Sequence, residues 1–276
     1  MRLAEFVLEP PKILLYGPPG GGKTALASTL GPGCIYIDVD GGIETAVTLK
    51  DKHSNDRKEI DYIPIKEVNV FTPAKWRKVK EKVIELVNMS PEKLKGKSVV
   101  LDSITTAGEA AMQFILGNSS RLGTDGTIKT KSGGPEIQDW GLAMAELERV
   151  LMYLRSLPCT VVVIGHQEMK PITENRDGEK VNYMVELHVI GSKLAPKVPS
   201  YFTEVWYLKP KSEAGGKLSY HIKTKHTSEI LARSRLNLPD PVDANLGMKE
   251  ILKLAGYKDL LNVNTNSSPN EVAKIS

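Results

Sequence analysis

The stretch Gly17-Pro-Pro-Gly-Gly-Gly-Lys-Thr24 restricts the fold of this chain more than any other feature of its sequence. It fits the pattern G-x-x-x-x-G-K-[ST] without a mismatch, and it lies between the apolar run KILLYG and a helical pattern that begins near Lys23. Glycines allow backbone N–H groups to turn inward around phosphate oxygens. We therefore predict a phosphate-binding loop, with contacts from Gly17, Pro18, Pro19, Gly20, Gly21, Gly22, Lys23, Thr24 and Ala25.

Two side chains of this loop and one further carboxylate predict a site for ATP and Mg²⁺. Lys23 is expected to reach the terminal phosphates, and the Thr24 hydroxyl is expected to bind the metal. Asp102 closes the apolar run SVVLD and is the natural partner for the water shell of the metal. The alternative for Asp102 is a cap on the helix that begins at Ile104.

Apolar runs and helical patterns alternate along the chain. Strands are predicted at 12–17, 34–40, 60–65, 98–102 and 160–165, and the clearest helices at 74–87 and 135–157. Strands that are apolar on both faces and separated by helices predict an α/β fold, with a mainly parallel sheet covered on both sides. The runs TEVWYLKP and KLSYHIKTK, around a turn that contains Gly215, predict a C-terminal antiparallel hairpin.

The residue after Asp102 raises the question of which group activates water. Many ATPases carry a Glu there, whereas this chain carries Ser103. The run YIDVDGGIE offers other carboxylates, and the strand that carries it can lie beside the phosphate-loop strand or the Asp102 strand. Asp40, the last residue of the predicted strand, is our candidate base. Glu44 is the alternative, and a surface carboxylate without a catalytic role is a third interpretation.

Length and composition are those of one α/β domain with a polar tail. The chain has 276 residues, 25% of them charged, and a formal net charge of +4, which permits an anionic partner without requiring one. We expect an ATPase domain over 1–261 and a disordered tail over 262–276. No segment approaches the length of an apolar membrane span, and no signal peptide is apparent, so we expect a cytoplasmic protein without a membrane partner.

The order of four motifs resembles the RecA-type recombinase core over about residues 12–239. These motifs are GPPGGGKT, YIDVD, VVLDS and VVVIGHQE. The chain looks most like the short phage single-strand annealing proteins built on that core, among the phage P-loop ATPases of the AAA type. The resemblance implies a RecA-like P-loop NTPase fold, Mg²⁺-dependent ATP hydrolysis stimulated by DNA, and a γ-phosphate sensor at Gln167. A polar residue leaving a strand is the alternative for Gln167.

The same resemblance implies a base on the second strand, which fits Ser103 after the metal-side Asp102. The usual base of that family is Glu, and Asp40 is one methylene shorter. The resemblance therefore implies either slow hydrolysis or substitution by Glu44.

RecA-like proteins assemble into filaments or rings with shared ATP sites, so the resemblance implies a homo-oligomer. In YHIKTK, alternation places Lys223 and Lys225 on one face, where they match paired lysines that the family presents to a neighbouring subunit. Arg233 and Arg235 are further candidates for that trans-acting role. The alternative is an edge strand whose solvated lysines protect against aggregation.

The family binds single-stranded DNA through two long loops. The first, 118–135, carries Arg121, Lys129 and Lys131 against one acid, and we expect these three residues to bind phosphates. The second, 168–190, has a net charge of −2, and the basic segment 75–97 has the charge pattern of a solvated helix face.

These features predict an ATP-dependent single-stranded DNA-binding protein for phage-type annealing in the host cytoplasm. The polar tail is a candidate contact for a single-strand-binding protein. Two alternatives remain open: a nucleotide-switched recombination mediator with little hydrolysis, and a ring-forming RecA-fold motor.

Overall fold

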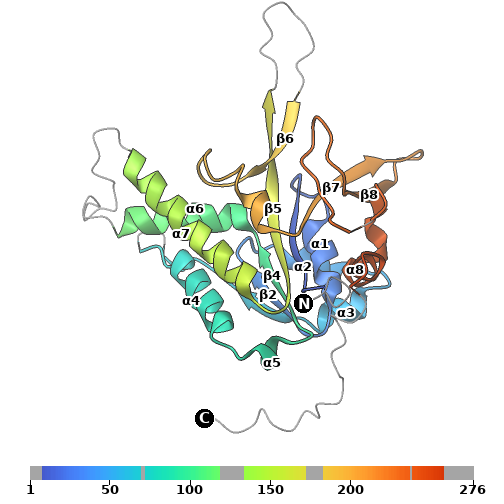
Figure 1. Ribbon diagram of the computed structural model, residues 1–276, viewed down its shortest axis with the longest axis horizontal. Helices are drawn as coiled ribbons and strands as arrows, with labels where there is room; N and C mark the ends of the chain where they lie inside the picture. Colours follow the sequence, from blue (N-terminus) through green and yellow to red (C-terminus); the bar gives the residue numbers. More distant parts are fainter. Residues whose placement is uncertain (1–7, 70–71, 119–133, 172–182, 237, 258–276) are drawn as a thin grey trace, which may run out of the picture.

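The computed structural model describes residues 8–69, 72–118, 134–171, 183–236 and 238–257. These residues build one nine-stranded sheet in the order β3-β2-β4-β5-β1-β7-β8-β9, with β6 paired to β5 (Figure 1). The strands are β1 (Lys12–Gly17), β2 (Cys34–Asp38), β3 (Asp61–Pro64), β4 (Ser98–Asp102), β5 (Thr160–Pro171), β6 (Tyr183–His188), β7 (Glu204–Ser212), β8 (Leu218–Lys223) and β9 (Val242–Asp243).

The six strands from β3 to β7 in this order run parallel, and β6, β8 and β9 are antiparallel to their neighbours. Strands β1, β2 and β4 are buried at every residue, which agrees with the apolar runs at their centres. The chain enters β8 through a turn with Gly215 and Gly216 at positive φ, which confirms the C-terminal hairpin. The predicted fold class is therefore confirmed.

Helices cover both faces of the sheet (Figure 1). One face packs against α4, α6 and α7, and the other against α1, α2 and α8, so each face has its own apolar cluster. The helices are α1 (Lys23–Ala27), α2 (Ile43–Thr48), α3 (Ser54–Lys58), α4 (Lys75–Val87), α5 (Pro91–Leu94), α6 (Ile104–Gly117), α7 (Ile137–Ser156) and α8 (Met248–Leu254).

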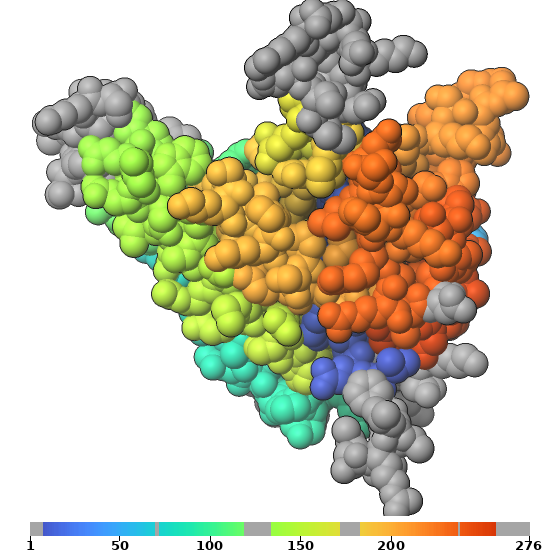
Figure 2. Space-filling model, turned by 45° about the horizontal axis from the view of Figure 1, so that its top comes forward, coloured from blue at the N-terminus to red at the C-terminus, as the bar shows by residue number. Residues whose placement is uncertain are grey.

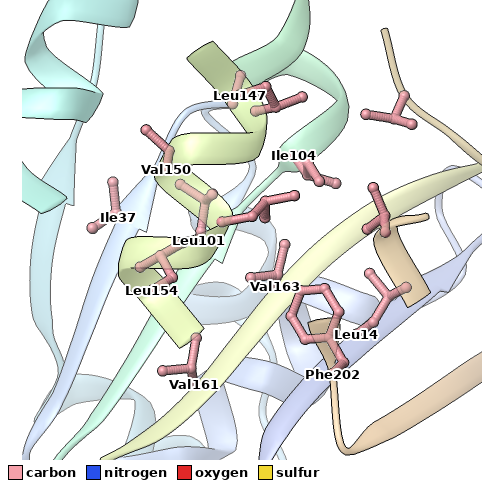
Figure 3. Packing of buried hydrophobic residues seen from close by; sticks show 14 of the residues in the cluster. Leu14, Ile37, Leu101, Ile104, Leu147, Val150, Leu154, Val161, Val163 and Phe202 are labelled. Atoms are coloured by element: carbon pink, nitrogen blue, oxygen red, sulfur yellow. The ribbon is translucent and has the colours of Figure 1, made fainter. Parts of the chain in front are cut away.

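The larger cluster forms where α7 lies across the middle of the sheet. Leu147, Val150 and Leu154 point from α7 toward Leu101 of β4 and Val163 of β5 (Figure 3). All five of these side chains are buried, and those of α7 recur at helical spacing. The cluster packs α6 and α7 against this face of the sheet.

The predicted apolar stripe of α7 is only partly buried. Ile137 is 93% exposed and Trp140 is 40% exposed, although both continue the helical spacing of the buried residues. A helix of 20 residues is about 30 Å long. Its first turns extend beyond the edge of the sheet, and the later turns pack against the strands.

Two predicted boundaries were wrong. Strand β2 ends at Asp38, because the N–H groups of Val39 and Asp40 both donate to the Asp102 carbonyl oxygen and the chain turns toward β4. Strand β5 continues to Pro171 and pairs with β6, so much of the predicted second loop is a β-hairpin.

Several predictions lie outside the described residues. Arg121, Lys129 and Lys131 fall within 119–133, and the whole tail 262–276 is outside as well. Among the helices that the structure does describe, none combines the length and the apolar character needed to cross a membrane.

Neighbouring residues of α7 provide a test of this packing. Leu151 is 1% exposed and Met152 is 55% exposed. We expect Leu151→Ala to lower the free energy of unfolding by about 2–5 kcal/mol because it leaves a cavity under the sheet. Met152→Ala is the matched control and should change it by less than about 0.5 kcal/mol. Urea unfolding followed by tryptophan fluorescence measures both, and equal effects would contradict the orientation of α7.

Candidate nucleotide site

The phosphate loop connects β1 to α1 through glycines that no other residue can replace without strain. Gly20 and Gly22 have φ of 69° and 87°, the left-handed region that favours glycine. At Gly17 a Cβ would collide with the Leu208 carbonyl oxygen of β7. The loop therefore keeps its shape because β7 approaches it closely on one side.

Lys23 lies folded over this loop and is only 5% exposed. Its Nζ donates to the carbonyl oxygens of Gly17 at 3.0 Å and Pro18 at 2.7 Å. Burial lowers the Lys23 pKa to about 8, although the negative charges of Asp102 and Asp40 oppose that shift. The ammonium group is thus held by weak neutral acceptors, which an anionic phosphate can replace.

Asp102 is 1% exposed and joins three elements. Its Oδ2 accepts hydrogen bonds from Thr24 Oγ1 at 2.7 Å and from Tyr36 OH at 2.6 Å. Burial raises the Asp102 pKa to about 6, and the two hydrogen bonds oppose that shift. A hydroxyl and a carboxylate in contact are oxygen donors of the kind that Mg²⁺ takes, so Thr24 and Asp102 fit the predicted metal site.

The helix-cap alternative for Asp102 does not hold, because Ser103 takes that role. Helix α6 begins at Ile104, and Ser103 Oγ accepts the N–H of Thr106 at 3.3 Å. Ser103 Oγ also donates to Asp40 Oδ1 at 2.9 Å. The residue that replaces the usual Glu therefore contacts the candidate base.

Asp40 lies two residues beyond β2, where both of its carboxylate oxygens are engaged. His166 Nε2 donates to Oδ2 at 2.9 Å, opposite the Ser103 contact. Burial acts to raise the Asp40 pKa, but hydrogen bonds from His166, Thr106 and Ser103 outweigh it, and the pKa lies below its ordinary value. Asp40 is therefore ionised at neutral pH, and its base strength is reduced.

The other two carboxylates of this segment differ in their surroundings. Asp38 accepts the N–H of Gly41 at 2.7 Å, the N–H of Ile43 at 3.4 Å and the hydroxyl of Tyr62 at 3.1 Å, so it holds the turn. Glu44 is exposed in the first turn of α2. Of these three carboxylates, Asp40 is the one that contacts Ser103, the residue after Asp102. Asp40 therefore remains the candidate base.

Gln167 lies inside β5, which continues to Pro171. The alternative interpretation, a polar residue that leaves the strand, therefore does not describe its position. Its neighbour His166 is in register with Gly17, which places Gln167 one residue past the start of the phosphate loop. Gln167 Oε1 accepts the hydroxyl of Tyr207 at 2.7 Å, and the rings of Tyr207 and Tyr16 lie 5.2 Å apart. The predicted sensor is thus connected to β1 and β7.

The basic residues proposed to act in trans do not share one setting. Strand β8 pairs with the short strand β9 at His221 and Ile222, so it is not a free edge there. Lys223 Nζ lies 3.6 Å from Asp240 Oδ2. Lys225 lies beyond the end of β8 and is exposed, as is Arg235. Arg233 donates to the carbonyl oxygens of Pro199 at 2.9 Å and Phe202 at 2.7 Å. That guanidinium is held within its own subunit, so the trans-acting assignment of Arg233 is withdrawn.

Two contributors escaped sequence analysis. Tyr36 looks like an apolar strand residue, and only the pairing of β2 with β4 brings its hydroxyl to Asp102. His166 lies within the motif VVVIGHQE but received no role from the sequence, and its contact with Asp40 spans 126 residues. Alternation does place Tyr36 and Asp38 on one face of β2, which is the single sequence signal for the tyrosine.

Residues 9–236 match the family model described as "AAA domain". The chain belongs to this family. Its membership agrees with the P-loop ATPase fold and implies ATP as the ligand of the phosphate loop. No curated protein matches the sequence.

Two solved structures resemble the chain. The flagellar accessory protein FlaH from Methanocaldococcus jannaschii is 14% identical, with a TM-score of 0.38 and coverage of 79% of this chain and 78% of FlaH. An ATPase from the type III secretion system of pathogenic bacteria is 13% identical, with a TM-score of 0.43 and coverage of 73% of this chain and 52% of that ATPase.

The setting of Asp102 predicts a pH dependence. If Asp102 holds Mg²⁺ as its carboxylate, Mg²⁺-dependent nucleotide affinity should rise with pH through about 6 and then level off. Tyr36→Phe removes a hydrogen bond that stabilises the carboxylate, so its rise should move to higher pH, with roughly tenfold weaker binding at pH 6. Titration with a fluorescent ATP analogue between pH 5 and 8 measures this. Tyr62→Phe is the control, because its hydroxyl contacts Asp38; equal shifts in both variants would contradict the assignment.

Proposed function

We propose that this chain is an ATP-dependent single-stranded DNA-binding protein of the RecA-core type that acts in phage-type recombination by strand annealing. The observation that carries the ATPase part is the position of Asp40. Its carboxylate touches Ser103, the residue after Asp102, and His166, the register partner of Gly17. A water bound there would lie between the two acidic residues and the phosphate loop.

The chain's own residues divide the work of hydrolysis. Lys23 would bind the terminal phosphate oxygens of ATP, and Thr24 and Asp102 would hold Mg²⁺, which would supply charge neutralisation there. Asp40 accepts the proton of the attacking water. Both Asp40 oxygens already accept hydrogen bonds, and these lower its pKa and so its strength as a base, while each oxygen keeps a lone pair that can accept from water. We therefore expect hydrolysis to be slow.

The same contacts favour a second candidate, a nucleotide-switched mediator that hydrolyses little ATP. A carboxylate with a lowered pKa and two donors is a weak base. In that case Gln167 and His166 would report nucleotide state to the paired strands β5 and β6, whose ends extend beyond the neighbouring strands (Figure 1). The ring-forming motor is a third candidate, and no described contact favours it.

Assembly and DNA contacts complete the proposal. Lys225 and Arg235 are exposed and can reach a neighbouring subunit's nucleotide, and Lys223 can join them by leaving Asp240. Arg121, Lys129 and Lys131 are proposed to bind DNA phosphates in the host cytoplasm. The basic residues of α4 are less suited, because Arg77, Lys80 and Lys82 have carboxylate partners at 3.7, 2.6 and 2.8 Å. A single-strand-binding protein is the proposed further partner.

Asp40→Asn tests the choice of base. We expect ATP binding within about twofold of wild type, and turnover lowered by roughly 10²–10⁴-fold because an amide cannot accept the proton of water. Glu44→Gln is the matched control and should keep wild-type turnover. Steady-state phosphate release with Mg²⁺ measures both. If only Glu44→Gln loses turnover, Glu44 is the base; if wild type releases no phosphate while binding ATP, the mediator candidate replaces the ATPase.

DNA binding is tested by anisotropy with a labelled oligothymidine across a salt series. ATP should raise the affinity of wild type but not of Lys23→Ala, which lacks the phosphate-binding ammonium. Lys129→Ala with Lys131→Ala should flatten the salt slope by roughly one unit for each lysine–phosphate pair that the substitutions remove. Arg77→Ala with Lys82→Ala on α4 is the control. A flattened slope in that control alone would move the DNA site to α4.

A further inference from the structure

A pocket separate from the nucleotide site lies between α6, α7 and the segment that follows β6. It has a volume of about 360 Å³, and the residues that matter most for its chemistry are Glu109, Met112, Gln113, Trp140, His188 and Ile190. None of the loop and acidic residues assigned to ATP lines it. Figure 2 shows a notch on this side of the molecule, between the N-terminal part of α7 in green and the β5–β6 hairpin in yellow.

Two glycines allow the segment after β6 to form one wall of this pocket. A Cβ at Gly108 of α6 would lie 3.0 Å from Ile190 Cγ2, and a Cβ at Gly191 would collide with Met144 Sδ of α7. The segment therefore packs tightly on both helices. Thr105 Oγ1 also donates to the His188 carbonyl oxygen at 2.7 Å, which holds the start of this segment, at the end of β6, against α6. The pocket is built by these contacts and is not a loose gap between helices.

Trp140 stands apart from the other tryptophans of the chain. Trp76 and Trp206 are fully buried, whereas Trp140 is 40% exposed at the edge of the pocket. Met112 and Ile190 are the apolar side chains that line the same pocket. An exposed indole beside a concave apolar surface offers a stacking platform for a flat ligand.

The polar side chains that line the pocket are available to a ligand. Within the described part of the chain, the side chains of Glu109, Gln113, Trp140 and His188 make no hydrogen bond or ion pair. Glu109 and Gln113 lie four residues apart on α6, so both face the pocket from one side. The lining thus combines two aromatic rings, the Trp140 indole and the His188 imidazole, with a carboxylate acceptor and an amide that can donate and accept.

We propose that this pocket binds an unpaired nucleobase of single-stranded nucleic acid. The base would stack on Trp140, and Glu109 would accept a hydrogen bond from an exocyclic amino group, as carboxylates do with cytosine. The inference rests on the proposed function, to which it adds base contacts beside the phosphate contacts. An apolar peptide side chain fits less well, because it would leave Glu109 and Gln113 desolvated without partners. A duplex is excluded from the pocket because its bases are stacked on one another and offer no free face to Trp140.

The exposed indole makes the test direct. Titration of the ATP-bound protein with oligodeoxycytidine should quench Trp140 fluorescence, and Trp140→Phe should abolish the quenching while keeping most of the affinity. Trp140→Ala should weaken binding by anisotropy roughly 5- to 100-fold, since base stacking accounts for that range in alanine substitutions. Glu109→Gln should reduce the preference for oligodeoxycytidine over oligothymidine. Met152→Ala, exposed on the same helix, should change none of these values.

The outcomes separate this proposal from the proposed function. If the oligonucleotide binds but Trp140 fluorescence does not change and Trp140→Ala binds as wild type, the pocket proposal is overturned and the DNA-binding function stands. If no oligonucleotide binds in any nucleotide state, both are overturned. If Trp140 fluorescence changes with protein concentration in the absence of DNA, a second copy of the chain occupies the pocket, and the nucleobase proposal is overturned.

Discussion

The buried carboxylate of Asp102 is the group on which the rest of the site depends. It is removed from water at the end of β4, and a carboxylate in that position requires strong hydrogen-bond partners. Thr24 from the start of α1 and Tyr36 from β2 supply them. The phosphate loop, the metal-side strand and the strand that leads to Asp40 are therefore joined at one oxygen atom. Loss of either donor leaves a buried acid that is poorly satisfied, and its raised pKa already shows the cost of that burial.

The order of the strands explains how distant residues meet around this carboxylate. Strand β5 lies between β4 and β1, so its residues border the acid on one side and the phosphate loop on the other. His166 consequently contacts Asp40 and is paired with Gly17, while Gln167 bonds to Tyr207 of β7. The phosphate loop is therefore connected to β6 through β5, and Thr105 at the start of α6 adds a second connection through the His188 carbonyl oxygen.

The pKa values of the candidate base, Asp40, and the candidate metal ligand, Asp102, are shifted in opposite directions. Burial dominates at Asp102 and raises its pKa to about 6, whereas hydrogen bonds dominate at Asp40 and lower its pKa. Two acids of the same residue type, each near the end of its strand, are thus kept distinct by their partners. Ser103 is central to the difference, since it caps α6 and donates to Asp40 with the same hydroxyl.

The sequence by itself determined the fold class and the phosphate loop. Strands that are apolar on both faces require a sheet covered by helices on both sides. A glycine-rich loop followed by Lys23 and Thr24 indicates phosphate binding. The strand SVVLD and the helix over 75–87 follow from the same local patterns, because each is specified by apolar residues within one short segment. Only the tertiary structure decided where side chains from different strands meet. Period-2 alternation assigns faces but cannot say which strands are neighbours, so Tyr36 and His166 were not recognised as partners of the acids.

The end of β2 and the setting of Arg233 were decided in the same way. A carbonyl of β4 ends β2 early and turns Asp40 out of the strand. Arg233 looked like a free cation in sequence, yet it is fixed by the carbonyl oxygens of Pro199 and Phe202, about 30 residues earlier. In each case the deciding contact is long-range, and a local sequence pattern holds no information about it.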